Sequence, residues 1–580
     1  MKKIRLLLLV VAIVLLGIVA SGQVAIPQAD LILFNGKIVT VDPQFSIAQS
    51  IAVRNGVILA VGSNQAVQAL AGTDTRRVDL RGHTMIPGLI DGHTHLFAME
   101  TDLPMIDVRS VRDILQVVSR EAARKKPGEW IELAPPGDPP YHINMLDRIA
   151  EKRLPTRREL DQAAPQNPVI IKSSQFHDDK RTTVLNSKGL ELFGITRDKG
   201  PANVNIVRDK DGMPTGVVIG SAVGDLNVNA VIRRNFTLDQ RLAELKKDFQ
   251  EFHAGGVTTH YEGHGMPEST IELYTELWKR GEMTMRSYLV KQLDDRKTIE
   301  AIAADLDRMK TFSGRGAGDD IFRVGGIAII FGDNVGFGQG FMREAYIGPD
   351  GKRWNGLQLV ADDKLYAIGK AATDRNFRLN IQASGGKAID VTVAALDRIN
   401  RETPLAPHRP VIIHAQFPSE QNMKDIARIG IIPTTVTNFL WGQGNNYIKY
   451  YGRENANRAI PIKSWLANGV PVVQSCDYGP HNGMFIIWQS MARKNGWTGE
   501  VLGPQETITR EQALRIFTNN GARLTFGEDK IGSLEKGKLA DIVILDRDII
   551  TVPLDQIRET KVIVTLVGGK EVYGSLSNIK

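Results

Sequence analysis

The sequence predicts an α/β protein, a (β/α)8 TIM-like barrel joined to a composite β-sandwich that the N- and C-terminal segments build together. Two observations predict this fold. The middle of the chain alternates short apolar β-type runs with helical stretches, and both ends are rich in β-type runs. Repeated strand-then-helix units require parallel strand pairing, and eight such units suggest a closed barrel. At 580 residues, the chain has room for both parts.

The composition is that of a globular protein. Apolar residues make up 42% of the chain and charged residues 24%, with no low-complexity tract. The net charge of +7 is spread along the chain and does not gather into basic runs. Nucleic acid is therefore not an expected partner.

Residues 1–22 predict a secretory signal peptide. Basic residues precede an apolar stretch from Leu6 to Ala20, which fits a signal better than a spanning helix of about 20 apolar residues. We expect cleavage near Gly22; an uncleaved segment would be the only contact with a membrane. The single cysteine, Cys476, excludes an intrachain disulfide. These features predict a periplasmic or secreted protein.

Both ends of the mature chain carry hairpin signals. Asn-Gly pairs lie between β-rich runs in residues 31–41 and 51–61, and Gly568-Gly569 divides another β-rich stretch near the C-terminus. We expect residues 30–86 and 530–580 to form the two parts of the sandwich. The barrel, residues 87–529, is then a single domain inserted between them.

The predicted barrel strands are apolar runs, and helical patterns separate most of them. After Thr237, a candidate N-cap, apolar residues recur at helical spacing until Gly255-Gly256 ends the helix and a strand begins. Residues about 98–235 do not fit the repeat, and we interpret them as a long excursion over the mouth of the barrel. The strands are expected at 85–95, 257–262, 283–291, 322–331, 377–384, 410–416, 431–436 and 471–477.

Two histidines one residue apart, His93 and His95, lie at the end of the first predicted strand. Residues two apart in a strand point to the same face, about 6.6 Å apart. Both imidazoles can therefore approach one zinc-like ion at about 2.0–2.1 Å. An isolated His-x-His pair is more often an ordinary core or surface feature, but barrel enzymes place their chemistry at the C-terminal ends of strands. This position favours a ligand role.

Several segments resemble the amidohydrolase superfamily, in particular the branch called amidohydrolase family 3. They are IPGLIDGHTHL (86–96), VIIHAQF (411–417), PVVQSCD (471–477) and GSLEKGKLADIVILD (532–546). The resemblance runs in order through roughly residues 30 to 575. It implies a metal-bearing barrel that hydrolyses amide or other non-peptide C–N bonds of small molecules.

Carried over by position, the resemblance implies that His93, His95, His414 and Asp477 hold the metal. A catalytic metal lowers the pKa of its bound water towards about 7. Asp477 suits a general base that takes the proton of this water and returns it to the leaving nitrogen. His414 either binds the metal or stabilises the developing oxyanion. Zinc is the expected metal, although manganese, cobalt and iron suit the same ligands.

Two positions depart from the family pattern. Ala328 stands where the family often has a lysine that bridges two metals, and Gln382 stands where a histidine usually ends the strand. Alanine cannot bind a metal, and a glutamine carbonyl is a poor substitute for imidazole on zinc. We therefore predict one tightly held metal ion instead of two.

The stretch GVTTHYEGHG (256–265) offers a compensation. His260 and Glu262 share one strand face, and His264 lies at or just past the end of that strand. These three side chains, with Gln382, are candidates for an auxiliary ligand or a substrate contact. The alternative is that they are ordinary polar residues of a loop rim. His142, His177 and His481 are weaker candidates in predicted loops.

Two functions fit the sequence. The first is an exported metal-dependent amidohydrolase, in which metal-activated water attacks an amide-type carbonyl. The second is a catalytically impaired barrel that serves as a periplasmic small-molecule binding protein, as the missing lysine and histidine suggest. The retained set of three histidines and Asp477 favours the enzyme, because polar groups buried in a barrel mouth are costly unless something binds them. The substrate and the oligomeric state, a homo-oligomer included, stay open.

Overall fold

A computed structural model describes residues 28–96, 103, 105, 108–136, 149–172, 182–202, 204–220, 226, 228–232 and 236–579. The predicted signal peptide, His142 and His177 lie outside the described residues. Within these ranges, no helix is long and apolar enough to cross a membrane.

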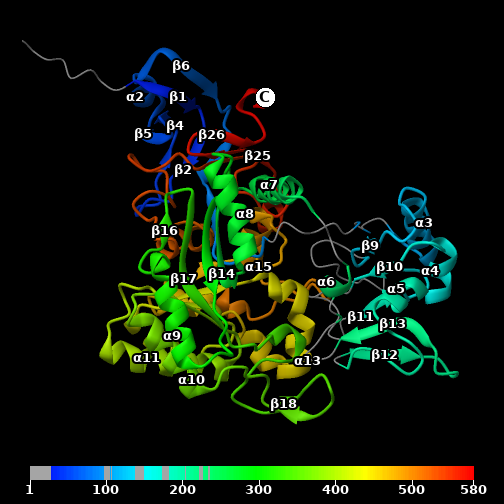
Figure 1. Cartoon of the computed structure of the whole chain (residues 1–580). Coiled ribbons are helices and arrows are strands. Elements are labelled where there is room, and N and C mark those ends of the chain that lie inside the picture. Colours follow the sequence, from blue (N-terminus) through cyan, green and yellow to red (C-terminus); the bar gives the residue numbers. More distant parts are fainter. Residues whose placement is uncertain are drawn as a thin grey trace, which may run out of the picture.

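Eight parallel strands form the barrel, which confirms the predicted fold class. Thr94 follows the first strand and Asp477 follows the last, and the two residues form a parallel β-bridge. This bridge brings the two edges of the sheet together. In Figure 1, β14 (Val257–Met266) and β17 (Phe322–Ile330) are green strands of this sheet, and β15 (Arg286–Gln292) pairs with both of them. The strand order is β8 (Leu89–Asp91), β14 (Val257–Met266), β15 (Arg286–Gln292), β17 (Phe322–Ile330), β20 (Leu379–Ala383), β21 (Val411–His414), β22 (Ile432–Thr435) and β23 (Val473–Gln474).

The predicted N-cap at Thr237 begins helix α7 (Leu238–Ala254). Its hydroxyl accepts the backbone N–H of Gln240, whose side chain accepts the N–H of Thr237 in return, and Gly255 ends the helix. The apolar face of α7 packs into the main core. The other helices around the barrel are α8 (Glu268–Lys279), α9 (Ile299–Arg308), α10 (Asp362–Thr373), α11 (Gly386–Glu402), α12 (Glu420–Ile429), α13 (Asn438–Arg458), α14 (Ile462–Ala467), α15 (Gly483–Ala492), α16 (Arg510–Ile516) and α17 (Asn519–Leu524).

Both ends of the chain contribute to two packed sheets outside the barrel. Figure 1 shows their blue N-terminal and red C-terminal strands together at one end of the molecule. One buried cluster, which includes Leu33 and Ile51 with Ile544 and Leu566, joins the two sheets. The first sheet has the order β5 (Val57–Gly62), β4 (Ser50–Arg54), β1 (Ala29–Phe34), β6 (Ala71–Asp79); the second has β26 (Lys570–Tyr573), β25 (Val562–Val567), β24 (Ile542–Leu545), β7 (Thr84–Pro87), β2 (Lys37–Val39), β3 (Ile47–Ala48).

Two of the three predicted hairpins are confirmed. Asn55-Gly56 turns β4 into β5, and Gly568-Gly569 turns β25 into β26, with positive φ at all four turn residues. The hairpin predicted around Asn35-Gly36 is wrong. Strand β1 pairs with β4 and β6, whereas β2 pairs with β3 and β7. This turn therefore passes the chain from one sheet to the other.

The excursion after β8 contains a sheet of its own, beside the barrel in Figure 1. Buried Ile114, Ile131, Leu160 and Val169 belong to a separate apolar cluster. Its predicted place over the mouth of the barrel stays a prediction, since residues 97–102, 137–148, 173–181 and 221–225 lie outside the described residues. The elements are β12 (Val204–Arg208), β13 (Pro214–Gly220), β11 (Thr182–Leu185), β10 (Val169–Ile171) and β9 (Ile131–Leu133) in sheet order, with α3 (Val111–Ala122), α4 (Arg157–Ala163) and α5 (Ser187–Leu192).

Candidate metal centre

Asp91 ties the first barrel strand to the last. Its Oδ1 accepts the backbone N–H groups of His93 (3.1 Å) and Cys476 (3.2 Å), and its Oδ2 accepts the Cys476 thiol. The N–H of Asp477 donates to the carbonyl of His93 (2.9 Å), and the Thr94 hydroxyl donates to the carbonyl of Asp477 (2.9 Å). These hydrogen bonds therefore fix the position of His93 relative to Asp477. Sequence reasoning missed Asp91, although its place two residues before His93, on the same strand face, was a usable signal.

The four predicted metal ligands lie in one buried cluster. Nε2 of His95 is 3.0 Å and Nε2 of His93 is 3.8 Å from Oδ1 of Asp477. The other carboxylate oxygen, Oδ2, is 4.0 Å from Nδ1 of His414. One carboxylate from the last strand thus faces imidazoles on two sides.

Strand β14 adds Glu262 and His264 to this cluster. Oε1 of Glu262 lies 3.5 Å from Nδ1 of His95 and 3.9 Å from Nδ1 of His93, and it accepts the backbone N–H of His264 (2.9 Å). The ring centre of His264 is 4.2 Å from that of His93 and 5.0 Å from that of His95. Glu262 therefore faces the edge of each imidazole that points away from Asp477.

The donor atoms of this cluster fit a divalent metal. Ligand atoms of His93, His95 and His264, and likewise those of His93, His414 and Asp477, all lie within 4.8 Å of one another. Both ring nitrogens of His93, Nε2 of His264 and Nδ1 of His414 are buried, and none of them has a hydrogen-bond partner among the described residues. Burying such atoms without a partner costs free energy, which metal binding offsets. Imidazoles with one carboxylate suit zinc and related transition metals.

Burial controls the charge of these groups. Burial and the neighbouring imidazoles hold the pKa of His93 and His264 well below 6.5, and burial lowers the pKa of His414 to about 4. Burial would lower the pKa of His95 as well, but Glu262 and the facing aspartate outweigh it and raise that pKa. Burial raises the pKa of Glu262 to about 7. Most of the imidazoles are thus neutral at pH 7, the form that binds metals.

The backbone is strained at two of these residues. His414 has φ of 75° and Asp477 has φ of 56°, in the left-handed region that residues with a Cβ seldom adopt. Each such residue costs on the order of 1–3 kcal/mol, and this kind of strain concentrates at functional sites. The strain falls where β21 ends and just after β23, at the positions that present side chains to the cluster.

His260 does not reach the cluster, which corrects the expectation that it supplements the ligands. Its Nε2 bonds to the hydroxyl of Ser287 (2.8 Å), and its ring lies 5.8 Å from that of Tyr274 on α8. The side chain thus packs between β14 and the helices. The pairing of β14 with β15 shifts register only after Glu262, so the alternation of faces along the strand does not predict the direction of His264.

Gln382 is also engaged elsewhere, which corrects its assignment as an auxiliary ligand. Its Oε1 accepts the N–H of Gly332 (2.8 Å), and its Nε2 donates to Oδ1 of Asp333 (3.0 Å). The carboxylate of Asp333 also accepts the N–H groups of Ser384 and Gly385. Gln382 therefore fastens β20 to the loop that follows β17.

Comparisons with known proteins agree with this geometry. The profile of the amidohydrolase family matches residues 76–573. N-substituted formamide deformylase of Arthrobacter pascens is 28% identical over 93% of this chain and 97% of its own length. Protein LONG AFTER FAR-RED 3 of Arabidopsis thaliana is 26% identical over 94% of this chain and 92% of its own. An uncharacterized metal-dependent hydrolase from Pyrococcus furiosus has the same fold, with a TM-score of 0.69 at 21% identity over 90% of this chain and 100% of its own.

Proposed function

Because this chain belongs to the amidohydrolase family, we propose that it hydrolyses a C–N bond of a small-molecule amide with the help of one bound metal ion. The observation that carries the proposal is the meeting of His93 and His95 with Asp477 at the C-terminal end of the barrel. N-substituted formamides are the first substrate class to test, since the Arthrobacter pascens relative is named for their deformylation and is covered over 97% of its length.

The residues of the cluster suit a single ion. His93, His95, His264 and Asp477 would hold it, with His264 in place of the histidine that the family usually has at the end of the fifth strand. Ala328 offers no ligand atom, and Gln382 is bonded to Asp333. A divalent metal bound here supplies Lewis acidity, which lowers the pKa of water and polarises a substrate carbonyl. We propose zinc, because neutral imidazoles with one carboxylate are its usual ligands.

Asp477 is placed to move the proton of the reaction. Its Oδ1 faces His95 at 3.0 Å and its Oδ2 faces His414 at 4.0 Å. A carboxylate in this position accepts the proton of an attacking water and delivers it to the leaving nitrogen. The neutral imidazole of His414, with a pKa of about 4, donates a hydrogen bond to the oxyanion that develops on the substrate.

Glu262 positions the two histidines of the first strand. Nδ1 of His93 and Nδ1 of His95 both face its Oε1. A carboxylate on the far side of a metal-binding histidine accepts the Nδ1 proton, which leaves Nε2 free for the metal and makes the ring a better donor. Glu262 is therefore a positioning residue in this proposal.

Asn438 suits the recognition of an amide substrate. It begins α13, just after the seventh barrel strand, and its side-chain amide is fully buried. Neither atom of this amide has a hydrogen-bond partner in the part of the chain that the structure describes. The ring of the next residue, Phe439, lies 5.7 Å from that of His414. One donor and one acceptor match the C=O and N–H of a secondary amide, and the bonds would remove the cost of the unpaired atoms.

Export of the protein remains a separate proposal, supported by the sequence of residues 1–22 alone. Cell fractionation with and without these residues tests it. We expect the full chain to reach the periplasm or the medium and the shortened chain to stay in the cytoplasm. Cytoplasmic protein in both cases would refute export.

Metal analysis together with turnover tests the proposed activity. We expect one equivalent of metal per native chain and turnover of at least one member of a panel of N-substituted formamides, N-acyl amides and cyclic amides. The His93→Ala variant should lose both. Tight metal without any turnover would favour the binding-protein alternative, and two equivalents would contradict a single ion.

A further inference from the structure

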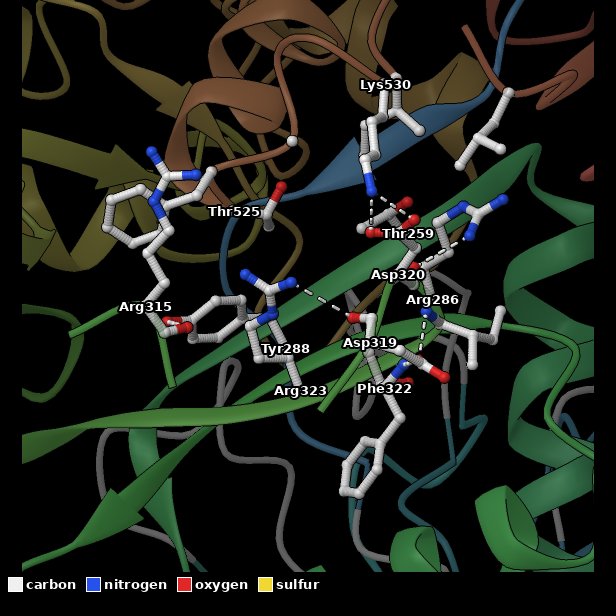
Figure 2. A pocket seen from close by; sticks show the side chains of 16 residues that line it. Thr259, Arg286, Tyr288, Arg315, Asp319, Asp320, Phe322, Arg323, Thr525 and Lys530 are labelled. Carbon is white, nitrogen blue, oxygen red and sulfur yellow. Dashed lines mark hydrogen bonds and ion pairs between the residues drawn. The ribbon is translucent and has the colours of Figure 1, made fainter. Parts of the chain in front are cut away.

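A cavity lies at the N-terminal ends of the barrel strands, opposite the metal centre. Its volume is about 120 Å³, and its walls come from the beginnings of β15 and β17, the loop before β17 and residues 525–531. By the same measure of open space, one water molecule needs only about 10–15 Å³, so the cavity has room for one small organic molecule. Figure 2 shows Arg315 and Arg323 on one side of it and Arg286 and Lys530 on the other.

The walls of this cavity carry more positive than negative charge. Arg286, Arg315, Arg323 and Lys530 line it, against Asp319 and Asp320. The positive charges of Arg286 and Lys530 are matched, because Arg286 makes two hydrogen bonds to the Asp541 carboxylate (2.7 and 2.9 Å) and Lys530 pairs with Asp320 at 2.6 Å.

Arg315 and Arg323 form no ion pair within 4 Å in the described part of the chain. Arg323 donates one long bond, 3.5 Å, to the backbone carbonyl of Asp319. The carboxylate of Asp319 attracts Arg323, but it already accepts the indole N–H of Trp278 (2.9 Å) and the N–H of Phe322 (3.0 Å). Two guanidinium groups are therefore available to an anion.

A third, fully buried guanidinium adds to the positive potential. Arg378 donates to the carbonyls of Arg409 (2.8 Å) and Leu524 (2.7 Å), and among the described residues no carboxylate pairs with it. The ring of Phe526, which lines the cavity, lies 4.9 Å from the Arg378 guanidinium and 5.4 Å from that of Arg315. Carbonyl dipoles and aromatic rings surround this buried charge without neutralising it, so it adds to the attraction for an anion.

The same walls offer one hydroxyl and an apolar surface. The Thr259 hydroxyl is buried and bonds to none of the residues that the structure describes, and the residue is 3% exposed. Ile321, Phe526 and Ile531 give apolar side chains to the wall. A ligand that fits needs an anionic head for the arginines and a compact apolar body.

We propose that this cavity binds a small organic carboxylate. Its oxygens accept from Arg315 and Arg323, one of them also from the Thr259 hydroxyl, and its apolar body packs against Phe526. Arginine forks match a carboxylate in geometry as well as in charge. The proposal does not depend on the reaction at the metal centre.

Benzoate, titrated calorimetrically into the metal-loaded full chain, is the probe. The variants are R315Q/R323Q, R315Q alone, and R458Q as the control, since Arg458 is exposed on α13 and pairs with Glu454, away from the cavity. We expect one equivalent of benzoate at the cavity, at least tenfold weaker binding in R315Q/R323Q, and unchanged binding in R458Q. R315Q alone, at an exposed position, decides the test if the double variant does not fold.

The controls separate this site from the metal and from other ligands. Benzoate held by the metal would disappear in His93→Ala and persist in R315Q/R323Q, which would overturn the proposal. Benzyl alcohol that binds as tightly as benzoate would show that the charge does not matter. Inorganic phosphate that binds more tightly than benzoate would overturn the assignment to a carboxylate. Absence of saturable benzoate binding by the native chain would refute the site itself.

Discussion

The buried ion pair between Arg286 and Asp541 should make one of the largest contributions of any single contact to the stability of this protein. It joins the start of β15 to the residue before β24, and thus the barrel to the sandwich. Both side chains are almost fully buried, and Asp541 also accepts the N–H of Gly568 at 2.8 Å. In D541A, the Arg286 guanidinium stays buried and loses its carboxylate. Removing one partner of such a pair costs about 3–5 kcal/mol.

Urea unfolding of the metal-loaded protein, followed by tryptophan fluorescence, measures this cost. The matched control is E454A, which breaks the exposed pair with Arg458 and should change the free energy of unfolding by less than about 1 kcal/mol. The double variant R286M/D541L removes both charges, and we expect it to recover most of the loss. A loss in D541A no larger than in E454A, or no recovery in the double variant, would refute this reasoning.

Three further results are expected. H264A should weaken metal binding at least tenfold in equilibrium dialysis, whereas H260A should leave it unchanged because His260 lies outside the cluster; equal effects would contradict the ligand set. D477N should lower kcat by about 10²–10⁴ in steady-state assays, as loss of a general base does, and near-native turnover would exclude that role. Burial lowers the pKa of His253 to about 4, so the folded state resists its protonation; stability should be complete above pH 6.5 and fall by about 2 kcal/mol at pH 5. In H253Q that part of the pH dependence of unfolding should be missing, and an unchanged slope would refute the assignment.

The metal cluster could be predicted because strand ends fix its side chains. His93 and His95 follow the first strand and Asp477 follows the last, so parallel pairing of all eight strands brings them to one edge of the barrel. For β14, the sequence indicated candidate residues but not which of them enter the cluster. A register shift inside that strand separates the directions of His260 and His264; Gly263 and Gly265 mark a bulge there but do not say which way the side chains turn.

The failed hairpin has a similar cause. Asn35-Gly36 and Asn55-Gly56 have the same turn chemistry, yet only the second joins paired strands. The difference lies in long-range partners, because β2 pairs with β7, more than forty residues further along the chain. The excursion was not assigned a sheet of its own. Strands β9 and β10 are three residues each, too short to show periodicity, although β12 and β13 are longer.

Anomalous diffraction from crystals of the zinc-loaded protein, recorded at the zinc edge, tests the central claim most directly. A single strong peak bonded to His93, His95, His264 and Asp477 is the predicted result. A peak that touches neither His93 nor His95 would contradict a catalytic centre built around one ion. Two peaks of equal height in the cluster would contradict it as well.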